Sequence, residues 1–542
     1  MDETKHEQVE VKQKQTPSWQ TVPGYQPKPL FDLEKRDVIF AACGVAASIC
    51  TAALGVFGGF AFGYLVSSVV MMTLFSVFFG KNRKLRAFPV VCGLLSLANS
   101  AVFVCTTNGS VRFFCVIVSL LLALVCFDGF LNGSTVGNRK TLEVFYRAGA
   151  TVDNIDVSVK TLFSNRNGNK RAIGKVLIGL ACAVPVLLVV VPLLVSSDDA
   201  FRGMMNNIFR DTRNSIFKVI LGLGISTFVI SYGLSLKTGR VAKLKDKQHA
   251  GIENIYIISF LSAIALCYCL YLFSQLAYFF SAFKGFLPDG EITYAQYARK
   301  GFFEMCVIAV INLVLVLVAL LIARKKDGKV NCAVKALATF IGAFTMVIIA
   351  TAISKMVLYI DAYGMTVLRV TTSAFMVFLC VLFICIILRI YMANINIVKV
   401  ALLTAGCIVL ALGTVNVNAI CARYNYESYQ SGKLDTIDVD ALYDLGEEGI
   451  PYVVKLASGE DEAIAQKAKE YLAEAYLYDY FDNVQVDEQF AVEDLKGKEK
   501  TQGFERFSVP RAAAYKSLYA FLKENPNFAA ECKEFYPSDY ND

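Results

Sequence analysis

Long apolar runs alternate with short polar segments over most of the 542-residue chain. A helix that crosses a bilayer needs about 20 apolar residues, and in lipid it is the only open-chain structure whose backbone groups all bond internally. The run from Val38 to Phe79 holds no charged residue and is long enough for two such helices, so we expect a turn at Gly58-Gly59. Nine more runs of spanning length follow, at residues 87–106, 113–131, 173–195, 217–236, 255–279, 302–323, 336–360, 366–391 and 397–420. The pattern therefore predicts about eleven spans.

The two ends of the chain lack this pattern. Residues 1–37 are polar and contain four prolines, which predicts a disordered tail. After residue 420, apolar residues recur at helical spacing near residues 442–456, 463–480 and 510–523. We therefore expect an all-α polytopic membrane protein in three parts: the tail (1–37), a multi-pass transmembrane domain (38–420), and a small soluble helical domain (421–542).

Composition and charge add an orientation to this picture. Hydrophobic residues make up 56% of the chain and charged residues 18%, and the mean hydropathy of +0.50 indicates lipid as the main solvent. Lys and Arg gather in every second connection, starting with the tail, and such charge is retained in the cytoplasm. Residues 420–542 are acidic instead, with 13 Lys/Arg against 25 Asp/Glu. We expect a cytoplasmic N-terminus and an extracytoplasmic C-terminal domain.

Three polar stretches at span ends carry a resemblance to a known family. Residues 294–303 read Tyr-Ala-x-Tyr-x-Arg-x-Gly-Phe-Phe, residues 196–201 read Ser-Ser-Asp-Asp-Ala-Phe, and residues 358–369 read Leu-Tyr-Ile-x-x-Tyr-Gly-x-Thr-x-Leu-Arg. With these stretches in this order, the chain resembles a large uncharacterised family of bacterial multi-pass inner-membrane proteins, defined only as a domain of unknown function. The resemblance implies a bacterial cell-membrane protein. One departure is Ala200, where we expect Pro after the Asp.

The same stretches supply the candidate site residues, which we expect at the outer leaflet. The candidate cluster comprises Asp198, Asp199, Tyr294, Tyr297, Arg299, Lys355, Tyr359, Tyr363 and Arg369. Ionisable residues within spans are costly and often functional, but long basic side chains near a span end also reach the headgroups. An aspartate paired with a basic member gives either a structural ion-pair cluster, the favoured reading, or a site for an anionic or zwitterionic headgroup or solute. Asn312, inside a span, either bonds a neighbouring helix, which is the favoured reading, or lines a pathway.

The sequence contains no phosphate loop, catalytic triad, nucleotide motif or metal-ligand cluster. We therefore predict no cofactor, metal or nucleic-acid partner, and an enzyme is the less favoured reading. Sixteen cysteines lie mostly inside apolar runs, where Cys is a small buried hydrophobe; a bridge between Cys421 and Cys532 is also less favoured.

Three functions remain open. Transport or handling of a small solute or lipid ranks first, with membrane lipid as a partner. An envelope sensor or scaffold, whose external domain binds a partner, ranks second. A membrane-embedded transferase built on Asp198 and Asp199 ranks third. A polar cavity at mid-membrane depth favours transport, whereas a sealed bundle favours a sensor or scaffold.

Overall fold

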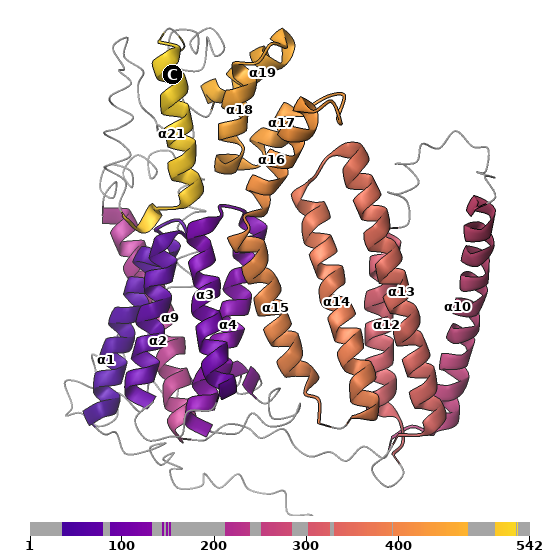
Figure 1. Cartoon of the computed structure of the whole chain (residues 1–542). Helices are drawn as coiled ribbons and strands as arrows, with labels where there is room; N and C mark the ends of the chain where they lie inside the picture. The colour runs from indigo at the N-terminus through magenta and orange to yellow at the C-terminus, as the bar shows by residue number, and fades with distance from the viewer. Residues whose placement is uncertain are drawn as a thin grey trace, which may run out of the picture.

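The structure is a computed structural model of the chain, and helices dominate it (Figure 1). It describes residues 35–79, 87–132, 212–238, 251–283, 302–325, 330–392, 394–474, 504–526 and 528, and a few residues between 144 and 155. Within these ranges the chain forms no strand; one isolated bridge joins Ile252 to Ala323. The longer helices stand side by side, and shorter ones gather over one end of this bundle.

Nine helices among the described residues are long and apolar enough to cross a bilayer, which makes the chain a multi-pass membrane protein. They are α1 with the π-helix that continues it (Arg36–Val56), α3 (Ala87–Cys105), α4 (Gly109–Asn132), α9 (Thr212–Thr238), α10 (Asn254–Phe283), α12 (Phe302–Ile322), α13 (Cys332–Tyr363), α14 (Val367–Tyr391) and α15 (Ile397–Thr414). Helix α2 (Phe62–Phe79) is shorter but also apolar. The predicted span at 173–195 lies outside the described residues, so a total of eleven stays a prediction.

The opening apolar run folds back on itself where the sequence predicts a turn. Helix α1 (Lys35–Cys50) continues into η1, a π-helix over Thr51–Val56, and α2 starts at Phe62. Gly59 (φ 74°) and Phe60 (φ 49°) adopt left-handed backbone conformations between them. Glycine reaches this region without a Cβ penalty, which explains a turn centred on Gly58-Gly59.

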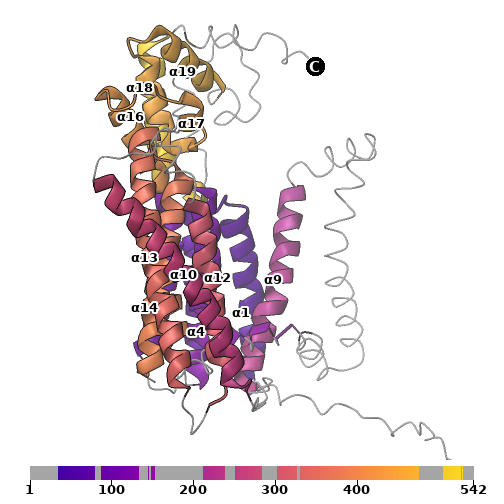
Figure 2. The same cartoon turned by 90° about the vertical axis from the view of Figure 1, so that its right-hand side faces the viewer.

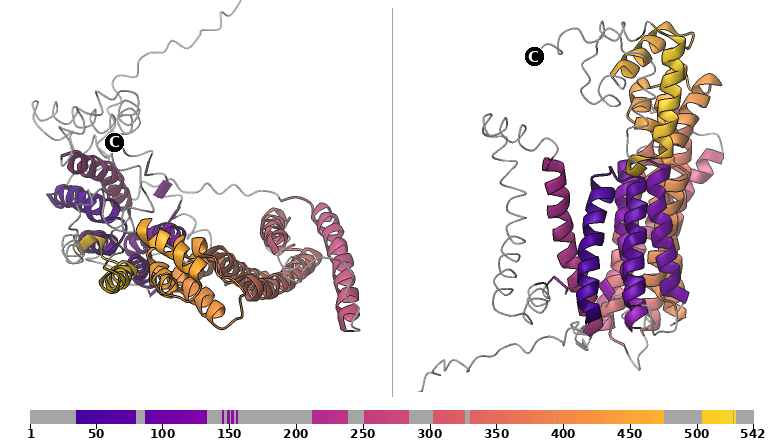
Figure 3. Two further views of the ribbon diagram at one scale, coloured as in Figure 1. Left: turned by 90° about the horizontal axis from the view of Figure 1, so that it is seen from above. Right: turned by 90° about the vertical axis from the view of Figure 1, so that its left-hand side faces the viewer.

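The bundle consists of two groups of helices that meet at α15. Helices α1, α2, α3, α4 and α9 pack together in the first group, and α10, α12, α13 and α14 form the second. Helix α15 packs against α3, α4 and α14. Seen from above, α10 lies farthest from the first group (Figure 3, left), and the side view places it across α12 and α13 (Figure 2).

Small and polar residues hold the helices together inside the bundle. A Cβ on Gly406 would overlap Leu95 of α3, so glycine lets α15 lie close to α3, and Asn99 donates to the Gly406 carbonyl at 3.2 Å. Such small residues and interhelical hydrogen bonds are typical of membrane helix packing.

In the second group, Asn312 accepts from the Tyr268 hydroxyl at 2.5 Å and donates to Thr345 Oγ1 at 2.9 Å. Asn312 thus ties α12 to α10 and α13, as expected from its place inside a span.

The turns η1–α2, α3–α4 and α13–α14 lie at one end of the bundle, which we call the capped end because the last helices cover it. We call these helices the C-terminal unit: α16 (Val417–Gln430), α17 (Val439–Tyr443), η2 (Gly446–Glu448), α18 (Ile450–Ala457), α19 (Glu462–Glu474), η4 (Phe504–Arg506) and α21 (Val509–Glu524). Buried Leu442, Val453, Leu472 and Leu518 contribute to its apolar core.

The helix boundary before the C-terminal unit differs from the sequence prediction. Helix α15 ends at Thr414 instead of near residue 420, because Asn416 takes a left-handed conformation (φ 54°) and its side chain caps α16 by accepting from the Ala419 N–H. Pro451 lies in the first turn of α18, where the missing N–H costs nothing. Cys421 is a buried free thiol, and burial raises its pKa to about 12. Its suggested partner Cys532 lies outside the described residues, as do residues 1–34 of the predicted tail. Residues 35–37, which the sequence assigned to the disordered tail, belong to α1 instead.

Candidate functional site

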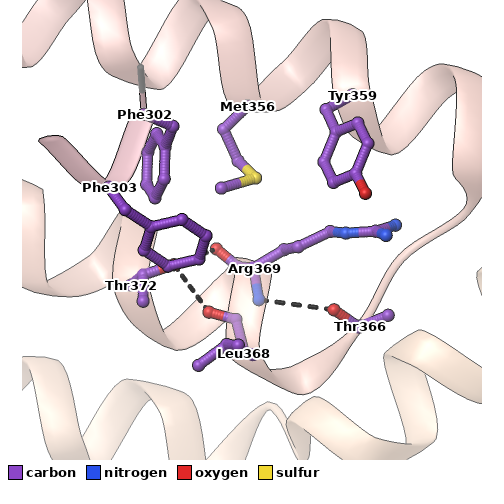
Figure 4. Close-up of a pocket in the computed structure, with 8 residues that line it drawn as sticks. All are labelled: Phe302, Phe303, Met356, Tyr359, Thr366, Leu368, Arg369 and Thr372. Atoms are coloured by element: carbon purple, nitrogen blue, oxygen red, sulfur yellow. Dashed lines mark hydrogen bonds between the residues drawn. The ribbon is translucent and has the colours of Figure 1, made fainter. Parts of the chain in front are cut away.

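A pocket opens beside the α13–α14 turn at the capped end (Figure 4). Its volume is about 230 Å³, and we call it the Arg369 pocket. Its lining residues are Phe302, Phe303, Met356, Tyr359, Thr366, Leu368, Arg369 and Thr372. Pockets that enclose a drug-sized ligand measure roughly 300–1,000 Å³, so this one suits a headgroup or one part of a larger molecule.

The lining of the Arg369 pocket is apolar on one side and charged on the other. Phe302 and Met356 are buried and form the floor, whereas Phe303 and Leu368 are 49% and 60% exposed at the rim. Arg369 supplies the positive charge. An apolar wall next to one cation is the pattern expected of a site for an amphipathic molecule.

The backbone of the α13–α14 turn places Arg369 at the pocket. Helix α13 continues to Tyr363, instead of ending near residue 360, and the chain departs from the helical conformation at Gly364 (φ 76°). Thr366 then caps α14, since its side chain accepts from the Arg369 N–H at 3.5 Å. Arg369 is therefore fixed in the first turn of α14, directly after a tight reversal.

The Arg369 side chain turns back over the end of α13. Its Nη1 donates to the Tyr363 carbonyl at 3.1 Å and to the Gly364 carbonyl. The guanidinium carbon lies 4.2 Å from the centre of the Tyr359 ring, close enough for a cation–π interaction. The carbonyls at a helix C-terminus lack partners within the helix. Arg369 donates to two carbonyls there, those of Tyr363 and of the C-cap residue Gly364, and its positive charge interacts favourably with the negative end of the helix dipole.

The C-terminal unit binds the same turn from above. The Asn425 side chain of α16 accepts from the Met365 N–H at 2.7 Å and donates to the Met365 carbonyl at 2.9 Å, as a neighbouring strand would. Asp361 accepts from Lys433 at 2.8 Å and from the Tyr424 hydroxyl at 3.1 Å. The turn that carries Arg369 is thus attached to α16 on both sides of Gly364.

A second contact joins the C-terminal unit to the α3–α4 turn in the other helix group. Glu448 is buried, and its carboxylate accepts from the Thr107 N–H at 2.8 Å, from Thr106 Oγ1 at 3.2 Å and from Thr107 Oγ1. Arg112 supports the turn from the bundle side by donating from Nε to the Thr106 carbonyl at 2.8 Å. One buried carboxylate therefore holds the turn by three hydrogen bonds.

Asparagine side chains extend this second contact. Asn108 donates to Asn418 at 2.6 Å, and Asn418 donates to the Leu445 carbonyl at 2.9 Å. Asn416 donates to the Cys105 carbonyl at 2.8 Å, at the end of α3. These bonds connect α3, α16 and the segment before η2, so the C-terminal unit contacts both helix groups.

Next to Glu448, the Glu447 carboxylate accepts from Arg511 Nε at 2.6 Å. Burial raises the pKa of Glu447, and the Arg511 guanidinium opposes that shift without cancelling it. Glu447 is therefore more easily protonated than an exposed glutamate. Within the described residues, no group of three or more His, Cys, Asp or Glu side chains is placed to hold a metal ion.

Residues 69–456 match the model of a family described as Domain of unknown function (DUF4153). The match covers well over half of the chain. The chain belongs to the DUF4153 family. No curated protein and no solved structure matches it.

The DUF4153 segment contains both contacts and the whole Arg369 pocket. Of the nine candidate residues, Tyr359 and Arg369 line this pocket, and Tyr363 adjoins it with its ring centre 5.0 Å from that of Tyr359. Lys355 lies one helical turn before Tyr359 and is half-buried. Five candidates lie outside the described residues: Asp198, Asp199, Tyr294, Tyr297 and Arg299.

The sequence reasoning did not find the polar contacts that Glu448, Asn418 and Asn425 make within the DUF4153 segment. The sequence does contain a local signal for the α3–α4 turn, because Asn108-Gly109 follows two threonines and an Asn-Gly pair marks a turn. Its partner Glu448 is separated from Thr107 by 341 positions, and only the folded chain brings them together.

Proposed function

We propose that this DUF4153 protein binds and handles an amphipathic small molecule, a membrane lipid or an amphipathic solute, in the Arg369 pocket. The observation that carries the proposal is the pocket lining, which combines the positive charge of Arg369 with apolar Phe302, Phe303 and Leu368. Phe303 and Leu368 are on the exposed rim, so an acyl chain can lie against them from the side of the bundle.

The expected topology agrees with this role. The positive connections predict that the capped end faces outside, so the Arg369 pocket belongs to the outer leaflet. Membrane lipid is then the partner nearest to the site. We propose that five other candidate residues contribute to the same outer-leaflet site: Asp198, Asp199, Tyr294, Tyr297 and Arg299.

A sensor or scaffold is the second candidate function. It is favoured by the two attachments of the C-terminal unit, through Asn425 to the α13–α14 turn and through Glu448 to the α3–α4 turn. A partner or ligand that displaces this unit would act on both helix groups at once. Such a partner would bind the acidic surface that the sequence predicts after residue 420.

A pair of adjacent threonines allows a matched test of ligand binding. Thr372 lines the Arg369 pocket, whereas its neighbour Thr371 does not; both are half-buried and both donate to a carbonyl four residues earlier. We expect Thr372→Phe to fill the pocket and Thr371→Phe to leave it open.

Full-length protein with either substitution is purified in mild detergent, and bound lipids and solutes are identified by native mass spectrometry. The expected result is an amphipathic molecule bound to the wild type and to Thr371→Phe but lost from Thr372→Phe, at equal melting temperatures. Equal occupancy in both variants would place any ligand elsewhere and contradict the proposal.

A further inference from the structure

The hydrogen-bond donors of Arg369 are only partly used by the described residues. A guanidinium carries five N–H donors in a planar fork. The Nη1 group binds the Tyr363 and Gly364 carbonyls, while Nε and Nη2 make no hydrogen bond to any residue in the described ranges. The unused edge of the fork is the one that matches the two oxygens of a carboxylate or phosphate.

The structure also holds this edge in place. Two carbonyl bonds and the Tyr359 ring, at 4.2 Å from the guanidinium carbon, fix the plane of the group. A pre-organised guanidinium loses little side-chain freedom when it binds an anion.

Arg369 forms no ion pair with a described carboxylate. Asp361, the acidic residue of the same turn, is already engaged by Lys433 at 2.8 Å and by the Tyr424 hydroxyl at 3.1 Å. The positive charge at the Arg369 pocket is thus without a counterion in this part of the chain.

We infer that the molecule in the Arg369 pocket carries an oxyanion, a phosphate above all, bound by Nε and Nη2 of Arg369 with its apolar part against Phe303 and Leu368. The inference rests on the proposed function and names the chemistry of its ligand. A phospholipid headgroup and a soluble phosphate ester both provide that chemistry.

A matched pair of lipids tests the inference without any change to the protein. Dioctanoyl phosphatidic acid and dioctanoylglycerol have the same acyl chains and differ in the phosphate; inorganic phosphate represents the soluble source. Dissociation constants are measured for the full-length protein in detergent. Charge-assisted hydrogen bonds predict that phosphatidic acid binds about ten-fold or more tightly than dioctanoylglycerol.

Each outcome separates the inference from the proposed function. Equal affinity for the two lipids, with both lost in Thr372→Phe, would overturn the oxyanion and retain the amphipathic site. Binding of neither lipid would overturn both. Inorganic phosphate that binds as tightly as phosphatidic acid would support the oxyanion site and contradict a need for the apolar part.

Arginine variants assign the oxyanion to Arg369. Arg369→Lys keeps the charge but not the fork, and we expect it to lose most of the preference for phosphatidic acid; Arg369→Gln is expected to lose all of it. If Asp199→Asn restores the stability that Arg369→Gln loses, an internal carboxylate occupies the fork and the inference is wrong. Unchanged preference in Arg369→Gln would also overturn it.

Discussion

The contact between Glu448 and the α3–α4 turn offers a quantitative test of how the C-terminal unit is attached. Glu448→Ala removes a buried carboxylate that accepts from the Thr107 N–H, from Thr106 Oγ1 and from Thr107 Oγ1. The two hydroxyl groups can rotate toward other acceptors, but the backbone N–H cannot. We therefore expect the substitution to weaken the attachment and leave the membrane helices intact.

The size of the effect follows from these bonds. An orphaned backbone donor costs about 1–3 kcal/mol, and the lost charge-assisted bonds add to this cost. The substitution also removes the cost of desolvating a buried carboxylate, and this gain offsets part of the lost stability. The net expectation is about 2–4 kcal/mol, or a roughly 30- to 1,000-fold shift in the equilibrium between attached and released unit.

Hydrogen exchange of the full-length protein in detergent measures this equilibrium by segment. In Glu448→Ala, amides of α17 and α18 and of the α3–α4 turn should exchange faster by the factor above, while α12 and α13 stay unchanged. Glu470→Ala is the control, because Glu470 is exposed on α19 of the same unit, and its effect should stay within about 0.5 kcal/mol. Equal exchange in the two variants would refute the assignment of Glu448 as an attachment point.

Three further predictions follow from the charges. Reporter fusions at Lys245 and Lys433 should lie on opposite sides of the membrane, because Lys and Arg alternate across the spans; a common side would overturn the topology. The pKa of Glu447 is higher in the folded state than in the unfolded state, where it is roughly 4.3. Protonation of Glu447 therefore stabilises the fold, and this stabilisation is fully present below the unfolded pKa and is lost as pH rises through the folded pKa. The melting temperature of Glu447→Gln relative to wild type should therefore increase from about pH 4.5 to about pH 7.5, and a constant difference would contradict the shift. Arg369→Gln should lower stability by about 1–3 kcal/mol, since the carbonyls of Tyr363 and Gly364 at the end of α13 lose their donor, whereas exposed Lys325→Gln should not; equal melting temperatures would show that this cap is unimportant.

The sequence was sufficient to find the membrane helices of the described ranges, because bilayer thickness sets a length that apolar runs must reach. The start of α12 at Phe302 and the turn at Gly58-Gly59 are examples. Helix ends that depend on the backbone conformation of a single residue were harder to predict from the sequence. The left-handed Asn416 interrupts an apolar run that composition alone continues to residue 420.

The site was predictable only in part. Tyr359 and Arg369 were candidates because both lie in a stretch that carries the family resemblance, and Arg369 also because an ionisable residue within a span is costly and often functional. The role of Arg369 as a cap on α13 depends on backbone carbonyls, which carry no sequence signal. The pairing of Glu448 with Thr107 joins positions 341 apart, and nothing local to either residue indicates the other.

The most direct test of the central claim is a cryo-electron microscopy map of the full-length protein in nanodiscs that contain phosphatidic acid. The account predicts density in the Arg369 pocket, with a headgroup within hydrogen-bonding distance of Nε and Nη2 of Arg369 and an acyl chain along Phe303 and Leu368. A map in which the pocket is empty, or in which Asp198 or Asp199 occupies the guanidinium, would contradict it.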